Sequence, residues 1–95
     1  MECLSKEGTM RIEKIKEAVG TLSKTTLEIY FKNWRFAPYV KRVRRDRYWH
    51  YEYLYCQDFF NHLYTYLTNK RQIKGAENLK KNFEKEGLKL EYLED

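Results

Sequence analysis

The sequence has few of the residues that characterise disulfide-linked or membrane-spanning proteins. Its 95 residues include only two cysteines, Cys3 and Cys56, which allow at most one bridge, and we expect both thiols to be reduced. No run approaches the roughly 20 consecutive apolar residues of a membrane span. The N-terminus shows no apolar signal-peptide segment. These absences predict a soluble, cytoplasmic protein with no membrane partner.

Residues for catalysis or metal binding are also scarce. The chain has four glycines and no glycine-rich phosphate loop, and no pair of carboxylates lies among its apolar segments. His50, Cys56 and His62 are each six positions apart, which matches no common zinc-binding spacing. We therefore expect no enzymatic activity, no metal and no cofactor.

Length and composition predict one small domain over residues 1–95. Hydrophobic residues make up 42% of the chain and charged residues 35%, so the core must be small and partly aromatic. The only proline is Pro38, and no linker-like segment divides the chain. The aromatic residues concentrate between positions 30 and 66. Helical spacing assigns the following residues to the core: Tyr30, Phe31, Trp34, Phe59, Phe60 and Leu67.

The net charge of +5 comes from one short segment. Residues 1–34 carry six basic and five acidic side chains, and residues 51–95 carry seven basic and eight acidic ones, so these two parts nearly cancel. Residues 35–50 hold six basic side chains against Asp46 alone. A local basic patch of this kind predicts a polyanionic partner.

Two helices are predicted in the first third of the chain. The first covers residues 10–19, where apolar residues recur at helical spacing, and Gly20 ends it. After the turn at 21–23, Ser23 caps a second helix that runs from Lys24 to about Trp34. One face of this second helix is apolar. The opposite face carries Lys24, Glu28, Lys32 and Arg35.

Pro38 is expected to end helical structure, and residues 39–53 are rich in β-forming residues. We predict a β-hairpin with a basic tip and a loose connection around residues 45–47, because the segment lacks Asn-Gly and Asp-Gly. Asp58 is the predicted N-cap of a third helix that ends near residues 69–71. A weaker fourth helix covers residues 76–86, with Gly87 as its stop.

The final residues 88–93 alternate apolar and polar side chains, which fits either a short strand or a docking tail within a C-terminal segment at 75–95. Leu88, Leu90 and Leu93 would either form a homodimer contact or pack on their own chain. We slightly favour the dimer, which a protein that binds two half-sites would need.

The order helix, turn, capped helix, proline, basic hairpin and helix predicts a mainly α fold with a β-hairpin. More finely, it predicts a winged helix-turn-helix of three to four helices, with its core at residues 10–67, in which the second helix enters the DNA major groove and the hairpin contacts the backbone. The candidate nucleic-acid-binding residues are Ser23, Lys24, Thr25, Glu28, Lys32, Arg35, Lys41, Arg42, Arg44, Arg45 and Arg47.

Four segments carry a family resemblance: 12–19, 23–31, 36–39, and 47–51 leading to 58–60. In the order of these elements the chain resembles small winged-helix proteins of the MerR-like and phage excisionase kind, although the usual glycine at the wing tip is missing. The resemblance implies sequence-specific binding of double-stranded DNA in transcriptional regulation or as a recombination accessory factor. It also implies a phage or mobile-element origin, with the host cytoplasm as the place of action if the protein is viral.

Two other functions fit the same residues. Tyr, Trp and Arg are typical anchors of protein interfaces, so the chain could be a small inhibitor or adaptor, for example of a host nucleoprotein machine. Trp49, Tyr51 and Tyr53 are expected to share one face of the second hairpin strand. If that face is bare, it favours RNA, single-strand or protein binding; if it is buried, it favours duplex DNA.

Overall fold

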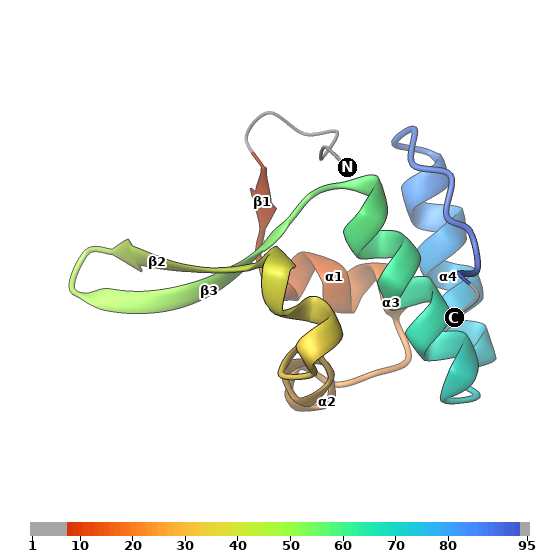
Figure 1. Cartoon of the computed structure of the whole chain (residues 1–95), viewed down its shortest axis with the longest axis horizontal. Helices are drawn as coiled ribbons and strands as arrows, with labels where there is room; N and C mark the ends of the chain where they lie inside the picture. Colours follow the sequence, from red (N-terminus) through yellow and green to blue (C-terminus); the bar gives the residue numbers. More distant parts are fainter. Residues whose placement is uncertain (1–7, 94–95) are drawn as a thin grey trace.

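A computed structural model describes residues 8–93, apart from the side chain of Arg45. Within this range four α-helices, one 3-10 helix and a three-stranded antiparallel sheet follow one another, with the hairpin projecting away from the helices (Figure 1). The order is β1 (Thr9–Met10), α1 (Ile12–Val19), α2 (Lys24–Phe31), η1 (Trp34–Tyr39), β2 (Val40–Arg45), β3 (Tyr48–Leu54), α3 (Gln57–Asn69) and α4 (Ile73–Glu84). The predicted mainly helical fold with a hairpin agrees with this architecture.

The first two helices have the predicted ends on either side of their turn. Gly20 ends α1 in the left-handed conformation with φ 75°, which glycine adopts without steric cost. Ser23 caps α2, and its hydroxyl accepts a hydrogen bond from the backbone N–H of Thr26 at 3.2 Å. The start of α1 is two residues later than predicted, because Met10 belongs to β1.

The end of α2 differs from the prediction. The helix stops at Phe31, and the side chain of Asn33 accepts a hydrogen bond from the N–H of Arg35 to begin the 3-10 helix η1. Pro38 lies inside η1, after α2 has already stopped at Phe31, so the proline does not end helical structure as predicted. The break at residues 32–33 rotates the following side chains. As a result Trp34 is 77% exposed and does not belong to the core, while Phe36 is fully buried in its place.

The sheet has the order β1-β3-β2. The sequence did not predict β1, which pairs with the last residues of β3 through Met10 and Tyr53. The hairpin lies where predicted, but Arg45 and Tyr48 are paired, so its connection is a tight turn of only two residues. Asp46 makes this turn with φ 57°, a conformation that aspartate tolerates better than most residues.

Both later helices exist, with shifted starts. Cys56, and not Asp58, occupies the N-cap of α3, and Asp58 lies in its first turn. A carboxylate in the first turn is favourable there because the exposed N–H groups carry partial positive charge. The helix α4 begins at Ile73, three residues earlier than predicted, and ends at Glu84. Cys3, the other half of the candidate disulfide with Cys56, lies outside the described residues.

The C-terminal residues 88–93 form an extended docking tail and not a strand. Leu88 and Leu90 are buried against their own chain, and side chains of α3 bond the backbone of alternate tail residues. Gln57 bonds both backbone groups of Lys89, Asn61 accepts from the N–H of residue 91 at 2.9 Å, and Thr65 accepts from that of residue 93 at 2.7 Å. The buried leucines are therefore engaged within the monomer.

An aromatic core joins the helices to the root of the hairpin. Phe59 contacts Phe31, Phe36 and Tyr53, with ring centroids 5.5 to 6.0 Å apart. Phe60 stacks on Phe83 of α4 at 4.2 Å. Of the predicted core residues, Phe31, Phe59, Phe60 and Leu67 are buried, Tyr30 is half-buried and Trp34 is exposed.

Gly75 provides a test of helix packing. It lies in α4, and a Cβ added to it would lie 2.7 Å from Oγ1 of Thr21 and 3.0 Å from Cγ1 of Val19. Alanine in a helix is normally more favourable than glycine by about 1 kcal/mol. Here we expect Gly75→Ala to lower the free energy of unfolding by about 1–2 kcal/mol, because the methyl group overpacks this contact. Urea unfolding measures the change.

The double variant Gly75→Ala/Thr21→Ala supplies the control for this prediction. Removing the threonine hydroxyl relieves the closer of the two contacts, so the double variant should recover part of the lost stability. A single variant more stable than the wild type would show that α1 and α4 are not closely packed at this point.

Candidate nucleic-acid interface

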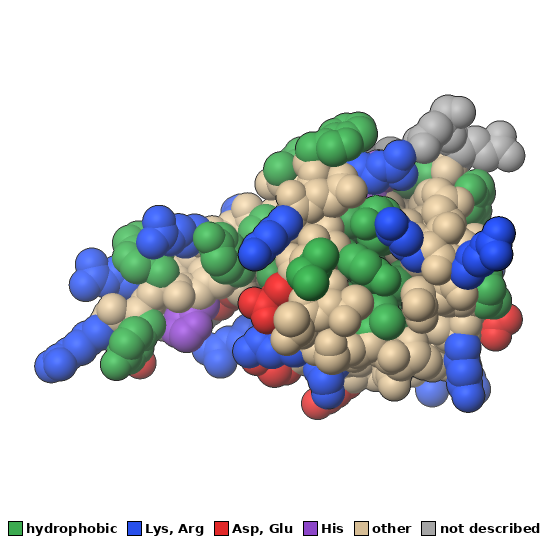
Figure 2. Space-filling view, turned by 90° about the horizontal axis from the view of Figure 1, so that it is seen from below, with side chains coloured by type: hydrophobic (Ala, Val, Ile, Leu, Met, Phe, Trp, Pro, Cys, Tyr) green, Lys and Arg blue, Asp and Glu red, His purple; other side chains and the backbone are tan. Residues whose placement is uncertain are grey.

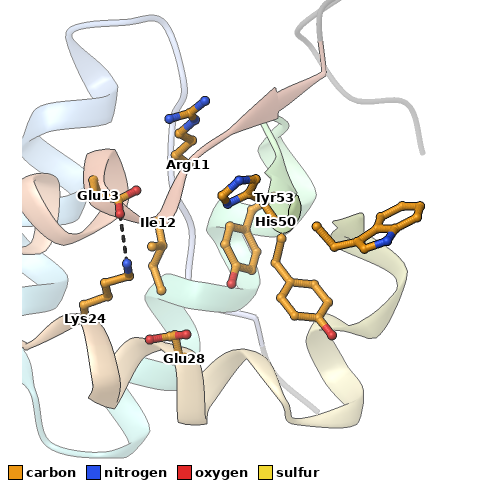
Figure 3. A pocket seen from close by; sticks show the side chains of 9 residues that line it. Arg11, Ile12, Glu13, Lys24, Glu28, His50 and Tyr53 are labelled. Carbon is orange, nitrogen blue, oxygen red and sulfur yellow. Dashed lines mark ion pairs between the residues drawn. The ribbon is translucent and has the colours of Figure 1, made fainter. Parts of the chain in front are cut away.

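A groove separates α2 from the hairpin. Its first hollow, of about 320 Å³, is lined by Arg11, Ile12, Glu13, Lys24, Glu28, Trp49, His50, Tyr51 and Tyr53. Figure 3 shows Lys24 and Glu28 on α2, with the hairpin residues His50 and Tyr53 across the opening. The N-terminal part of α1 closes one end. The groove thus combines residues that lie more than 30 positions apart in the sequence.

A second hollow of about 370 Å³ continues along the same side of α2. Glu28, Tyr51 and Tyr53 line both hollows, and Lys32 lines the second. The row Lys24, Glu28 and Lys32, spaced by one helical turn, therefore borders the groove along the length of α2. We call the two hollows together the α2–hairpin groove.

The outer half of the hairpin carries arginines and aromatic rings on one face. Arg42 lies opposite Tyr51 and Arg44 opposite Trp49, so all four side chains project from the same side of the ribbon. The guanidinium carbons of Arg42 and Arg44 lie 4.6 and 5.9 Å from the centre of the Trp49 ring. Figure 2, which views the side of α2, shows Lys and Arg side chains gathered along the projecting hairpin with hydrophobic ones between them.

These cation–π contacts orient the arginines without neutralising them. An exposed contact of this kind contributes about 0.5–1 kcal/mol, enough to bias a flexible arginine toward one arrangement. Trp49 and Tyr51 remain 52% and 60% exposed, whereas Tyr53 at the root is 4% exposed. The aromatic face of β3 is therefore buried at its base and bare toward the tip.

An ion pair occupies the end of the groove nearest α1. The ammonium of Lys24 lies 3.0 Å from the carboxylate of Glu13 (Figure 3). The backbone N–H of Glu13 and the bond from Lys24 hold the pKa of the Glu13 carboxyl below its ordinary value, and the same pair raises the pKa of Lys24. In the isolated protein the charge of Lys24 is thus partly engaged.

Tyr53 forms the floor of the groove. Burial, with a smaller effect from the negative charge of Glu28, raises the pKa of Tyr53 to about 12. Its phenol therefore stays neutral across the physiological range. Its ring packs on Phe31 of α2 at 4.5 Å, which sets the distance between α2 and the hairpin root.

The structure brings together only part of the predicted set. Lys24, Glu28 and Lys32 line the groove, Thr25 is exposed on the outer side of α2, and Ser23 caps this helix. On the hairpin, Arg42 and Arg44 share one face, the preceding Lys41 projects from the other, and Arg47 is exposed in the turn.

Arg35 is misplaced by the prediction. It follows the break after α2 and lies in η1, where its guanidinium carbon is 5.7 Å from the ring centre of Trp34. It therefore does not extend the row Lys24, Glu28 and Lys32. For Arg45 the structure describes the strand position, paired with Tyr48, but not the side chain.

Arg11, Glu13 and His50 also line the groove but were not among the predicted site residues. Arg11 and Glu13 lie just before and within α1, far in sequence from the basic segment. The sequence offers one signal for them: two charged residues lie two positions apart at the start of a helix whose N-terminus has no side-chain cap. That pattern is too common to identify a site. His50 lies between Trp49 and Tyr51 in β3, so its side chain projects from the opposite face of the strand.

Two further properties concern residues 8–93 as a whole. None of their helices is long and apolar enough to cross a membrane. No group of three or more His, Cys, Asp or Glu side chains in this part of the chain is arranged to hold a metal ion. The candidate site is the charged and aromatic surface of α2 and the hairpin.

Comparisons with protein-family models, with curated protein sequences and with solved structures gave no match for this chain.

The ion pair at the end of the groove yields a prediction about polyanion binding. Glu13→Gln should raise the affinity for a duplex oligonucleotide about two- to fivefold at low salt, because it releases Lys24 from a weak, exposed ion pair. The advantage should shrink as salt screens the charges. Fluorescence anisotropy over a salt series measures both effects.

Glu77→Gln is the matched control, because Glu77 is an exposed α4 residue that does not line the groove. It changes the net charge by the same amount. Equal gains from the two substitutions would mean that only the total charge matters and that Glu13 does not restrain Lys24.

Proposed function

We propose that this protein binds double-stranded DNA in a sequence-specific manner, as a winged helix-turn-helix domain. In this proposal α2 enters the major groove and the β2–β3 hairpin acts as the wing beside it. The observation that carries the proposal is the α2–hairpin groove, in which the exposed polar row of α2 faces the root of an arginine-bearing hairpin. Such an arrangement allows one duplex to contact both the helix and the wing.

The parts of the site have separate tasks under this proposal. The exposed guanidiniums of Arg42 and Arg44, held beside Trp49, supply phosphate contacts that do not depend on base sequence. Lys24 and Arg11 lie at the end of the groove nearest α1, where a backbone would pass. Thr25 and Glu28 are exposed on α2, and Lys32 is exposed directly after it, within reach of base edges. We place the activity in transcriptional control or in recombination, where such small domains act.

The proposal is supported by the fixed relation between α2 and the hairpin. The chain holds them through a buried contact between Phe31 and Tyr53, so both elements can engage one duplex without rearrangement. Preorganisation of this kind lowers the entropic cost of association.

Single-stranded nucleic acid is a second candidate, and one observation favours it. Trp49 and Tyr51 are exposed on the outer hairpin between arginines, an arrangement that can stack unpaired bases. Trp49→Ala should then weaken single-strand binding about fivefold or more, as expected from losing one stacked base, and weaken duplex binding much less, because there only the orientation of Arg42 and Arg44 is lost. Titrations with single-stranded and duplex oligonucleotides of equal length distinguish these outcomes.

The wing is tested by removing its charge. Arg42→Gln/Arg44→Gln should weaken binding to every duplex by a similar factor, and should reduce the slope of log Kd against log salt by about two, since each lost phosphate contact removes about 0.9. Binding to random-sequence duplex across a salt series measures the slope.

Lys81→Gln/Lys85→Gln is the matched control, because it removes the same charge from exposed residues at the end of α4. It should leave the slope nearly unchanged. Duplex binding that the hairpin variant retains in full, or no duplex binding at low salt by the wild type, would contradict the proposed function.

A further inference from the structure

Glu28 is a carboxylate in the middle of a surface proposed to meet a polyanion. It is exposed on α2, one turn from Lys24 on one side and one turn from Lys32 on the other. Among the described residues it forms no ion pair: Lys24 is paired with Glu13, and the charge of Glu28 acts on Lys24 only from a longer distance. A carboxylate facing phosphates costs affinity unless a hydrogen-bond donor meets it.

Only some base edges in the major groove supply such a donor. Cytosine presents its N4 amino group and adenine its N6 amino group, whereas guanine and thymine present acceptors to the same position. The carboxylate of Glu28 is therefore attracted by amino-bearing bases and repelled by the other two. Cytosine is the better partner, because adenine places the acceptor N7 beside its amino group.

Ile29 is the second unexplained side chain on α2. It is 62% exposed, although contact between an aliphatic side chain and water is unfavourable in free energy. It lies on the same outer side of the helix as Thr25, one turn earlier, and next to Glu28. The thymine C5 methyl is the one aliphatic group in the major groove, and contacts between it and apolar side chains are a regular means of recognition.

We propose that α2 recognises a site in which cytosine meets Glu28 and a thymine methyl meets Ile29. This inference rests on the proposed binding to duplex DNA and specifies which bases that binding selects. The lysines of the same helix and the arginines of the hairpin provide affinity for any sequence, while this adjacent acidic and aliphatic pair discriminates among bases. Discrimination at Glu28 works in part by repelling the wrong base.

Selection from a random duplex pool tests the carboxylate. The wild type should enrich cytosine at one position, and Glu28→Gln should shift the preference at that position from cytosine toward adenine by about tenfold, because a glutamine amide pairs with N6 and N7 of adenine. Glu77→Gln on α4 is the matched control and should return the wild-type site.

Removing a single methyl group from the selected DNA site tests the aliphatic contact. Replacing the relevant thymine by deoxyuridine removes only the methyl group and should weaken wild-type binding about threefold, close to the value of one buried methyl group. Ile29→Ala should be insensitive to the same replacement. Ile73→Ala, at an exposed isoleucine of α4, should remain as sensitive as the wild type.

The outcomes separate this inference from the function on which it rests. Duplex binding with a salt slope that depends on the hairpin, combined with unchanged base preference in Glu28→Gln and unchanged methyl sensitivity in Ile29→Ala, overturns the inference and leaves duplex binding in place. Absence of duplex binding by the wild type overturns both. A cytosine-to-adenine shift together with loss of methyl sensitivity supports the assignment of both residues.

Discussion

The ring of Phe31 lies against the ring of Tyr53 with centroids 4.5 Å apart, and Phe59 of α3 contacts both. Phe31 is the last residue of α2, and Tyr53 lies at the root of β3. Because both rings are buried, neither element can tilt without opening the core, and closely packed interiors resist such changes. The width of the α2–hairpin groove, and with it the separation of its charged residues, follows from this contact.

The helices behind this contact are stabilised by the docking tail. Gln57, Asn61 and Thr65 of α3 are four residues apart, which is about 6 Å along a helix, and they bond alternate residues of an extended chain, about 6.6 Å apart. The two periods agree closely enough for polar side chains to replace a neighbouring strand. Buried polar groups are thereby satisfied, and Leu88 and Leu90 complete the core.

Local signals predicted the elements whose ends depend on neighbouring residues: the stop at Gly20, the cap at Ser23 and the hairpin span. The exposure of Trp34 could not be predicted this way, because it results from a break at residues 32–33 that interrupts an otherwise regular apolar spacing. The strand β1 is too short to show a pattern. The groove was only half predicted, because Arg11 and Glu13 reach it through tertiary packing and not through sequence proximity.

The distribution of charge around the groove distinguishes the hairpin from α2. The outer hairpin is strongly basic, whereas the row on α2 alternates Lys24, Glu28 and Lys32, and Glu13 further offsets its positive charge. A uniformly basic α2 would bind any phosphate backbone tightly and gain little from the correct bases, since phosphate contacts carry no sequence information. Placing most of the charge on the hairpin leaves α2 close to electrically neutral, so that under the proposed function its affinity depends on the hydrogen bonds and apolar contacts that the bases supply.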